Sequence, residues 1–252
     1  MTPDQIAAFA RRALRIARGE IAAVSALFIV AAGVWSFADL AGDMAEGEER
    51  GFDLAVLHAL RPAANGLDPW GPGWLEEAAL DLTALGGLAV LGLFAVIVTG
   101  FLMLRRKRLS ALLLALGLAG GVGLSEGLKA LFGRERPPEV FRAVETLNAS
   151  FPSGHSLLSA VFYLSIGVML TRAFPERRFK AYVMAVAVLL TLIVGLTRVY
   201  LAAHWATDVL AGWSVGAAWA MTLWLVAYAL QRRQAGRPQT PHALPVDEGT
   251  QG

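Results

Sequence analysis

Long apolar stretches alternate with short polar connections along this chain of 252 residues. Each stretch is close to the roughly 20 residues that a helix needs to cross a bilayer. A helix is required there, because unpaired backbone amides and carbonyls are too costly in hydrocarbon. The pattern therefore predicts six membrane-spanning helices, over residues 21–40, 82–104, 109–132, 153–171, 181–199 and 207–230.

The amino-acid composition also indicates a membrane protein. Hydrophobic residues make up 56% of the chain and charged residues only 17%, below the fraction of roughly 25% that is usual in soluble domains. The chain has no cysteine, which excludes disulfides and thiolate metal sites. We expect membrane lipids rather than nucleic acid as partners, and no cofactor. The sequence does not indicate an oligomeric state.

Basic residues gather in four groups, and two predicted spans separate each group from the next. The groups are Arg11, Arg12, Arg15 and Arg18; Arg105, Arg106, Lys107 and Arg108; Arg172, Arg177, Arg178 and Lys180; and Arg232, Arg233 and Arg237. All four groups therefore face one compartment, which the positive-inside rule identifies as the cytoplasm. Unrelated solvated charge runs would show no such alternation. The pattern predicts that both termini are cytoplasmic.

The first predicted span has features of a signal peptide, with Ser36 and Ala38 as small residues ahead of a cleavage site. Its long basic lead-in and its span-sized apolar stretch favour a retained helix instead. We expect a single domain over residues 1–230, with its core at 81–230. The remaining residues, 231–252, are polar and contain several prolines, which predicts a disordered cytoplasmic tail.

The longest predicted connection, residues 41–81, lies on the outer side and carries apolar residues at helical spacing. These residues are Phe52, Leu54, Val56, Leu57 and Leu60. The spacing predicts a short amphipathic helix on the outer membrane face, with Trp70 and Trp74 at headgroup depth. An ordered loop is the alternative. The second and third spans are rich in glycine, which indicates close helix packing rather than a cofactor loop.

Three polar clusters interrupt the apolar pattern, and the predicted topology places all of them at outer ends of spans. The first cluster is Lys129 with Arg136-Pro137, the second is Pro152-Ser153-Gly154-His155, and the third is Arg198 with His204 and Asp208. Basic residues are scarce on the outer side, so Lys129, Arg136 and Arg198 need a reason beyond snorkelling at the membrane edge. A phosphate dianion supplies one, since arginine binds its oxygens bidentately and lysine adds a point charge.

The second cluster has the features of a helix start, and the third has a histidine that a nearby carboxylate can hold in one orientation. Ser153 is suited to cap the helix, and Gly154 lets a ligand approach the first-turn amides, which bind anions. His204 and Asp208 are four residues apart, so on a helix they share a face. Asp208 can then hold one ring nitrogen while the other acts as nucleophile or base. A simple capped helix is the alternative for the second cluster, but it does not require His155. A structural histidine is the alternative for the third cluster.

The order and spacing of the clusters resemble the three motifs of the type-2 phosphatidic acid phosphatase superfamily. The matching stretches are Lys129-x6-Arg136-Pro137, Pro152-Ser153-Gly154-His155 and Arg198-x5-His204-x3-Asp208. The resemblance covers residues 81–230 and departs at Thr197, where the family usually has serine and threonine keeps the hydroxyl. Each motif alone is weakly specific, but three in order at one membrane depth are a strong signal.

The resemblance implies an all-α bundle of six transmembrane helices and metal-independent hydrolysis of a phosphate monoester or pyrophosphate. It makes His204 the nucleophile that forms a phosphohistidine and Asp208 its orienting partner. His155 would protonate the departing oxygen and then activate water. The phosphate would be held by Lys129, Arg136, Ser153, Gly154 and Arg198. These groups would neutralise charge as metal ions do elsewhere, so no metal ligand is expected.

A site level with the headgroups favours a lipid phosphate as substrate. Undecaprenyl pyrophosphate, phosphatidylglycerol phosphate and phosphatidic acid all fit this requirement. Similarity to bacterial members of the family favours the first two equally. The similarity to bacterial members also implies that the protein lies in a bacterial inner membrane, with the site facing the periplasm or exterior. A lipid-to-lipid phosphotransferase with the same site is the alternative. A transporter is disfavoured, because the middle parts of the spans have almost no polar residues. Related oxidases that use the same residues to hold vanadate are expected to be soluble, so a membrane-spanning chain argues against that function.

Overall fold

The computed structural model of the chain describes residues 3–48, 50–61, 67–144 and 148–235, with side chains from residue 20 to residue 233 within those ranges. This part of the chain is all-α, with no strand. The helices are α1 (Pro3–Glu46), α2 (Arg50–Ala59), α3 (Gly73–Thr83), α4 (Leu88–Leu104), α5 (Arg108–Phe132), α6 (Gly154–Ala173), α7 (Arg177–Tyr200) and α8 (Ala206–Ala235), with short 3-10 turns η1 (Ala84–Gly86) and η2 (Glu139–Phe141).

The helices confirm the predicted six-span architecture. Five single stretches are long and apolar enough to cross a membrane: Glu20–Glu46, Arg108–Phe132, Gly154–Ala173, Arg177–Tyr200 and Ala206–Arg233. The sixth is a bent pair, Gly73–Gly86 with Leu88–Leu104. Large hydrophobic side chains remain exposed on the outside of the bundle, with Phe28 at 73% and Val96 at 72%. Such surfaces are unfavourable in water and suit contact with lipid.

The bent span differs from its predicted form. The sequence predicted a helix from residue 82, whereas the helix begins at Gly73, directly after Pro72, and no glycine or proline interrupts it before the bend. The axis then turns by 47°, because Gly87 has an extended backbone with φ −70° and ψ 143°. A Cβ on Gly86 would collide with Val194 and lie 3.3 Å from Cβ of His155. The absence of a side chain at Gly86 thus lets the bend pack closely against α6 and α7.

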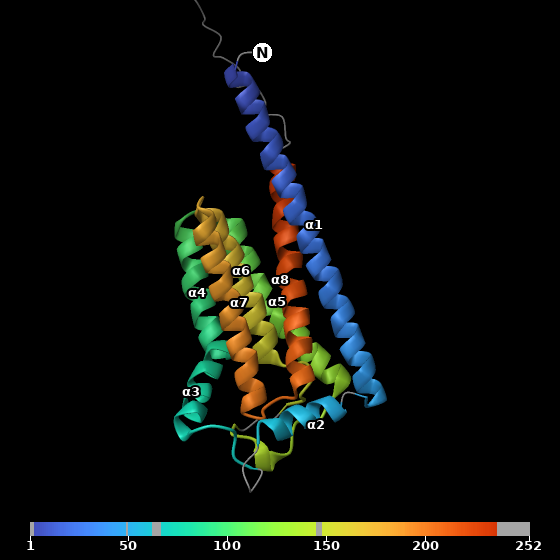
Figure 1. Cartoon of the computed structure of the whole chain (residues 1–252). Coiled ribbons are helices and arrows are strands. Elements are labelled where there is room, and N and C mark those ends of the chain that lie inside the picture. The colour runs from blue at the N-terminus through green and yellow to red at the C-terminus, as the bar shows by residue number, and fades with distance from the viewer. Residues whose placement is uncertain (1–2, 49, 62–66, 145–147, 236–252) are drawn as a thin grey trace, which may run out of the picture.

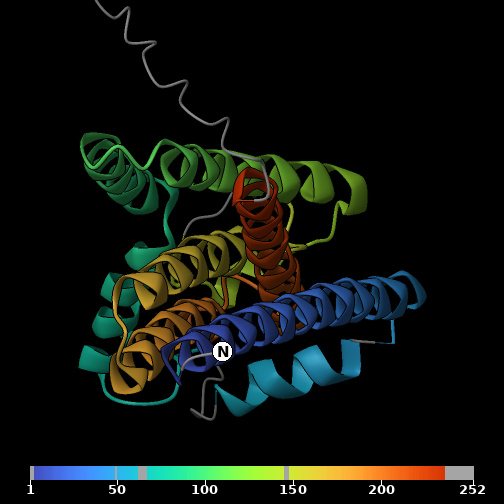
Figure 2. The same cartoon turned by 90° about the horizontal axis from the view of Figure 1, so that it is seen from above.

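Helices α6, α7 and α8 pack together, and α1 runs along α8 (Figures 1 and 2). Glycine makes the α6–α8 contact close: a Cβ on Gly212 would lie 2.6 Å from the carbonyl oxygen of Ser153. The prediction that glycines in the second and third spans mediate packing holds for Gly117, Gly120 and Gly121. It is wrong for Gly92, Gly100 and Gly123, where a Cβ would meet nothing within 4 Å; these glycines face outward.

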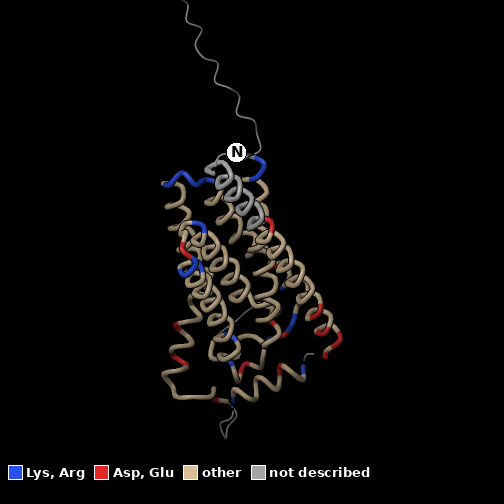
Figure 3. Tube along the Cα trace, turned by 45° about the horizontal axis from the view of Figure 1, so that its top comes forward, with Lys and Arg blue, Asp and Glu red and all other residues tan. Residues whose placement is uncertain are grey.

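The two ends of the bundle differ in charge: one is mainly basic, and the end that holds the predicted site carries acidic residues mixed with basic ones (Figure 3). The α4–α5 and α6–α7 junctions and the end of α8 carry the basic groups around residues 105–108, 172–180 and 232–233. Arg237 lies outside the described residues, as does most of the predicted tail. Residues 231–235 continue α8 as helix, which corrects the prediction that the tail begins at 231. The acidic residues in the last two turns of α1 and those of α3 lie toward the other end, where α2 crosses the bundle near the start of α8 (Figure 1), whereas Glu20 of α1 pairs with Arg232 at the basic end.

The predicted helix in the outer connection is present as α2, and it buries a carboxylate that the prediction did not include. Asp53 and Leu57 are the buried residues, at 2% and 4% exposure, whereas Phe52 and Leu54 are exposed. The physical reason is that the carboxylate of Asp53 finds charged and polar partners inside the bundle. The location of α2 on the membrane face stays a prediction.

Candidate active site

The second cluster begins α6, as predicted. Ser153 is the N-cap residue, and its Oγ accepts from the amide of Ser156 at 3.4 Å and from the hydroxyl of Ser156 at 3.0 Å. A Cβ on Gly154 would lie 3.3 Å from Nζ of Lys129 and 3.0 Å from Oγ of Ser125. Glycine therefore lets the Lys129 ammonium lie beside the first turn of α6. The cation and the helix N-terminus both favour an anion at this place.

Lys129 and Arg198 approach this place from two other helices. Lys129 is in the last turn of α5, with its ammonium 3.2 Å from Oε1 of Glu126. Arg198 is in the last turn of α7 and is 5% exposed. Its NH1 donates to Oγ1 of Thr83 at 3.1 Å, while its Nε finds no partner among the described residues. A buried guanidinium with spare donors is suited to binding an anion.

His204 lies in the turn between α7 and α8, whereas Asp208 is in the first turn of α8. The predicted spans also leave His204 in the connection before the last helix, and the two side chains meet although one helix does not carry both. Nδ1 of His204 is 3.4 Å from Oδ2 of Asp208. The turn is held by the amides of Ala203 and His204, which donate to the carbonyl of Arg198 at 3.0 and 3.3 Å. Asp208 is fully buried and also accepts from the backbone amide of Trp205 at 2.9 Å.

The other ring nitrogen of His204 faces Arg136. Nε2 is 3.1 Å from NH1 of Arg136, whose guanidinium also donates to the carbonyls of Ala203 at 2.7 Å and Asn148 at 2.6 Å. Arginine is always a donor, so Nε2 must accept, and the proton of the neutral ring is assigned to Nδ1, facing Asp208. Burial lowers the pKa of His204 to about 4, against the opposing effect of Asp208. His204 is thus a neutral imidazole whose Nε2 lone pair is directed at the first cluster.

His155 completes the group from the first turn of α6. It lies against the bend before α4, where a Cβ on Gly87 would be 3.7 Å from its Nε2. It is close enough to interact electrostatically with Arg198, His204, Lys129 and Arg136. All three predicted clusters are therefore brought together at one end of the bundle.

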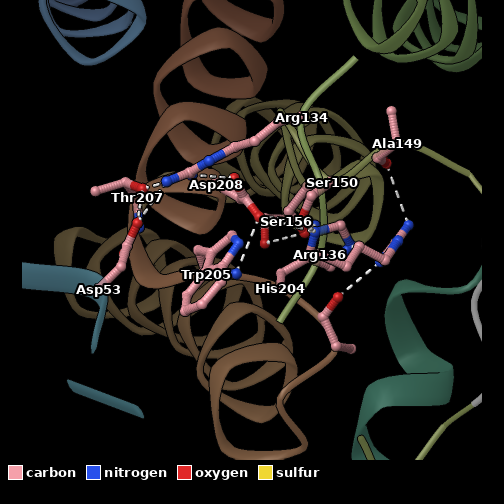
Figure 4. A network of polar contacts seen from close by, with 12 residues as sticks. Asp53, Arg134, Arg136, Ala149, Ser150, Ser156, His204, Trp205, Thr207 and Asp208 are labelled. Carbon is pink, nitrogen blue, oxygen red and sulfur yellow. Dashed lines mark hydrogen bonds and ion pairs between the residues drawn. The ribbon is translucent and has the colours of Figure 1, made fainter. Parts of the chain in front are cut away.

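Four further polar residues belong to this network and were missed at the level of sequence: Asp53, Arg134, Ser150 and Thr207. Arg134 donates through NH1 to Oδ1 of Asp208 at 2.5 Å and to Oγ1 of Thr207 at 2.8 Å, and through NH2 to Oδ2 of Asp53 at 2.7 Å (Figure 4). The hydroxyl of Ser150 donates to Oδ2 of Asp208. Burial alone would lower the pKa of Arg134, but Asp208 and Asp53 raise it above its ordinary value.

Only one of these four had a usable signal in the sequence. Arg134 is two residues from Arg136 on the outer side, where arginine is scarce. Asp53 appeared as a lone acidic residue on an amphipathic helix, and such a residue is most often solvated.

A cavity of about 690 Å³ lies beside the network, between the ends of α1 and α5, α2 and the segment that follows α5. Its lining includes Arg50, Asp53, Leu131, Arg134, Arg136 and Trp205. Among the described residues, no three His, Asp or Glu side chains are grouped so that they could hold a metal ion. The charge available to an anion here comes from guanidinium and ammonium groups.

The arrangement can bind an anion and attack it. Arg136, Arg198, Lys129 and the start of α6 offer donors from four segments, and Nε2 of His204 offers a lone pair beside them. Nucleophilic catalysis needs such a lone pair, held by a second group that stabilises the cation formed on attack, and Asp208 is placed to do this.

Comparisons with known proteins agree with this chemistry. The sequence profile of the PAP2 superfamily matches residues 108–232. Phosphatidylglycerophosphatase B of Bacillus subtilis (strain 168) is 35% identical over 144 residues, which is 57% of this chain and 70% of that protein. The crystal structure of a transmembrane PAP2-type phosphatidylglycerolphosphate phosphatase from Bacillus subtilis superposes with a TM-score of 0.74 at 28% identity. The match covers 81% of this chain and 98% of that one.

Proposed function

Because this multi-pass membrane chain belongs to the PAP2 superfamily and is a metal-independent phosphatase, we propose that it hydrolyses the phosphate monoester of phosphatidylglycerophosphate through a phosphohistidine at His204. The observation that carries the proposal is the placement of His204. One ring nitrogen faces Asp208 at 3.4 Å and the other faces Arg136 at 3.1 Å, beside the anion-binding groups.

The first chemical step is attack of Nε2 of His204 on phosphorus. The P–N bond forms as the bond from phosphorus to the lipid oxygen breaks, and His155 gives that oxygen a proton. Lys129, Arg136 and Arg198 stabilise charge on the three equatorial oxygens, together with the helix start at Ser153 and Gly154.

The second step is hydrolysis of the P–N bond. His155, now unprotonated, takes a proton from water, and the water oxygen attacks phosphorus. The P–N bond breaks, its electron pair returns to Nε2, and inorganic phosphate leaves. Throughout, the proton on Nδ1 stays between His204 and Asp208, whose carboxylate balances the positive charge of the phosphorylated ring.

A lipid substrate suits the position of the site. The site lies at the ends of α5, α6 and α7, where the apolar stretches stop. The tail of a lipid can remain in the bilayer while its phosphate reaches this depth. The curated Bacillus subtilis relative and the solved Bacillus subtilis structure that resemble this chain both carry names that refer to phosphatidylglycerophosphate, so we rank that lipid above undecaprenyl pyrophosphate and phosphatidic acid.

We further propose that the site faces the periplasm or exterior and that residues 1–230 form one domain. The orientation is supported by the charge difference between the two ends of the bundle (Figure 3), and the single domain by the packing of α1 along α8. The described basic groups lie opposite the site, and the positive-inside rule places such an end in the cytoplasm.

The test is phosphate release by the purified full chain in detergent, with excess chelator. Phosphatidylglycerophosphate, phosphatidic acid and undecaprenyl pyrophosphate are compared at equal mole fraction. The proposal predicts the highest kcat/KM for phosphatidylglycerophosphate. A higher kcat/KM for undecaprenyl pyrophosphate would overturn the choice of substrate. Phosphorylated acceptor lipid in place of free phosphate would show a phosphotransferase.

A further inference from the structure

Asp53 is a buried carboxylate that no cluster of the sequence contains. It lies on α2, outside residues 108–232 that match the family profile, and 154 positions before Thr207. It is 2% exposed. A buried carboxylate is costly unless charged or polar partners compensate it, so the contacts of Asp53 indicate why it is there.

The contacts of Asp53 all lead to the residues around Asp208. Its Oδ1 accepts from the backbone amide of Thr207 at 3.0 Å, and its Oδ2 accepts from the hydroxyl of the same residue at 2.6 Å. The amide belongs to the first turn of α8, which has no partner within its own helix. Asp53 therefore caps α8 from another helix, one residue before Asp208.

The second link runs through Arg134. This guanidinium bridges the two carboxylates, with NH2 on Asp53 at 2.7 Å and NH1 on Asp208 at 2.5 Å. With Asp53 in place, the two carboxylates and one guanidinium carry a net charge of −1. Without it, one carboxylate fewer would balance Arg134, and less negative charge would remain to face His204. In a buried network, the electrostatic effect of losing one negative charge is only weakly screened by solvent.

We propose that Asp53 is a positioning residue of the reaction: it caps the start of α8 and balances Arg134, so that the charge of Asp208 remains available to His204. This inference rests on the proposed role of His204 as nucleophile. Asp53 acts through Arg134 and through the backbone amide of Thr207, which a change of the Thr207 side chain keeps, and it does not touch the phosphate. Its loss should therefore slow the chemical step and leave substrate binding almost unchanged.

The primary test is Asp53→Asn in the full chain, which removes the charge and keeps the shape. We expect kcat to fall at least tenfold, with KM within about twofold of wild type. The matched control is Glu46→Gln, which removes an exposed carboxylate at the same end of the bundle and should leave both constants unchanged. A kcat for Asp53→Asn within twofold of wild type, or a loss confined to KM, would overturn the proposal.

A second pair of variants separates charge balance from simple structural support. In an Arg134→Gln background there is no cation to balance, so adding Asp53→Asn should cost less than threefold in kcat. An equal loss in both backgrounds would contradict charge balance. Thr207→Val removes a hydroxyl of the same network but no charge, and should lower kcat less than threefold. It tests the proposal even if Asp53→Asn does not accumulate as folded protein, because a tenfold or larger loss in Thr207→Val would overturn it.

Rapid-quench labelling separates this inference from the function on which it rests. If wild-type protein forms no phosphohistidine, the proposed function fails. If wild type forms it and Asp53→Asn forms it at the same rate, only the positioning role of Asp53 fails. We expect label at His204 in both proteins, appearing at least tenfold more slowly in Asp53→Asn.

Discussion

Nε2 of His204 lies 3.1 Å from NH1 of Arg136. The same lone pair that accepts from Arg136 is the one that would attack phosphorus. One lone pair cannot accept a hydrogen bond from NH1 and form a bond to phosphorus at the same time. When a phosphate binds, the guanidinium of Arg136 must therefore move its hydrogen bond from Nε2 to a phosphate oxygen. In the proposed mechanism, Arg136 would protect the nucleophile before the substrate binds and would bind the phosphate afterwards.

Arg136→Lys should lower kcat/KM about tenfold to a hundredfold. Lysine keeps the charge but cannot reproduce the fork that holds the carbonyls of Ala203 and Asn148. Each hydrogen bond to a charged group contributes about 1.5–3 kcal/mol, which sets this range. Arg105→Lys, at the opposite end of the bundle, is the control. Equal kcat/KM values for the two variants, measured by phosphate release, would exclude a special role for Arg136.

His155→Ala should affect substrates according to their leaving groups. A general acid contributes about a hundredfold to ten-thousandfold when the leaving group is a poor one, such as a lipid alkoxide. A nitrophenolate needs little protonation, so the first step with nitrophenyl phosphate should survive while water attack slows. His58→Ala, on the exposed side of α2, should behave as wild type. Equal losses on both substrates would refute the acid role of His155.

The His204 ring should stay neutral well below the usual histidine range. Its pKa is lowered from 6.5 to about 4 by burial. The unfolded chain therefore takes up the proton first, and the protein loses stability as pH falls from about 6.5 towards about 4. An NMR titration of histidine-labelled protein, assigned with His204→Gln, should show a neutral ring with its proton on Nδ1 at pH 5.5. A midpoint near 6.5 would contradict the buried geometry.

Much of the architecture could be predicted from sequence because hydrophobic length and charge are local signals. The spans, the Ser153 cap and the meeting of the three clusters all follow from local patterns and the alternation of sides. The bend at Gly86–Gly87 could not be predicted, because it depends on the approach of Val194 and His155. The role of Asp53 could not be predicted from the sequence for a similar reason. Its partners are 81 and 154 positions away, and only the packing of α2 against α8 makes its burial favourable.

The orientation can be measured directly because the chain has no cysteine. Glu139→Cys introduces a thiol near the site, where the native side chain is 89% exposed. Lys107→Cys and Glu176→Cys introduce thiols at the basic end. A membrane-impermeant maleimide should label position 139 in intact cells with a permeable outer membrane, and the other two only after lysis. The opposite labelling pattern would reverse the proposed topology.

The most direct test of the account is the identity of the phosphorylated residue during turnover. His155→Ala protein is mixed with radiolabelled nitrophenyl phosphate in excess chelator, quenched in base and digested, and the labelled peptide is sequenced by mass spectrometry. The account predicts a base-stable, acid-labile phosphoryl group on His204, and none in the His155→Ala/His204→Gln protein. Label on another residue, or turnover by His204→Gln at the wild-type rate, would contradict it.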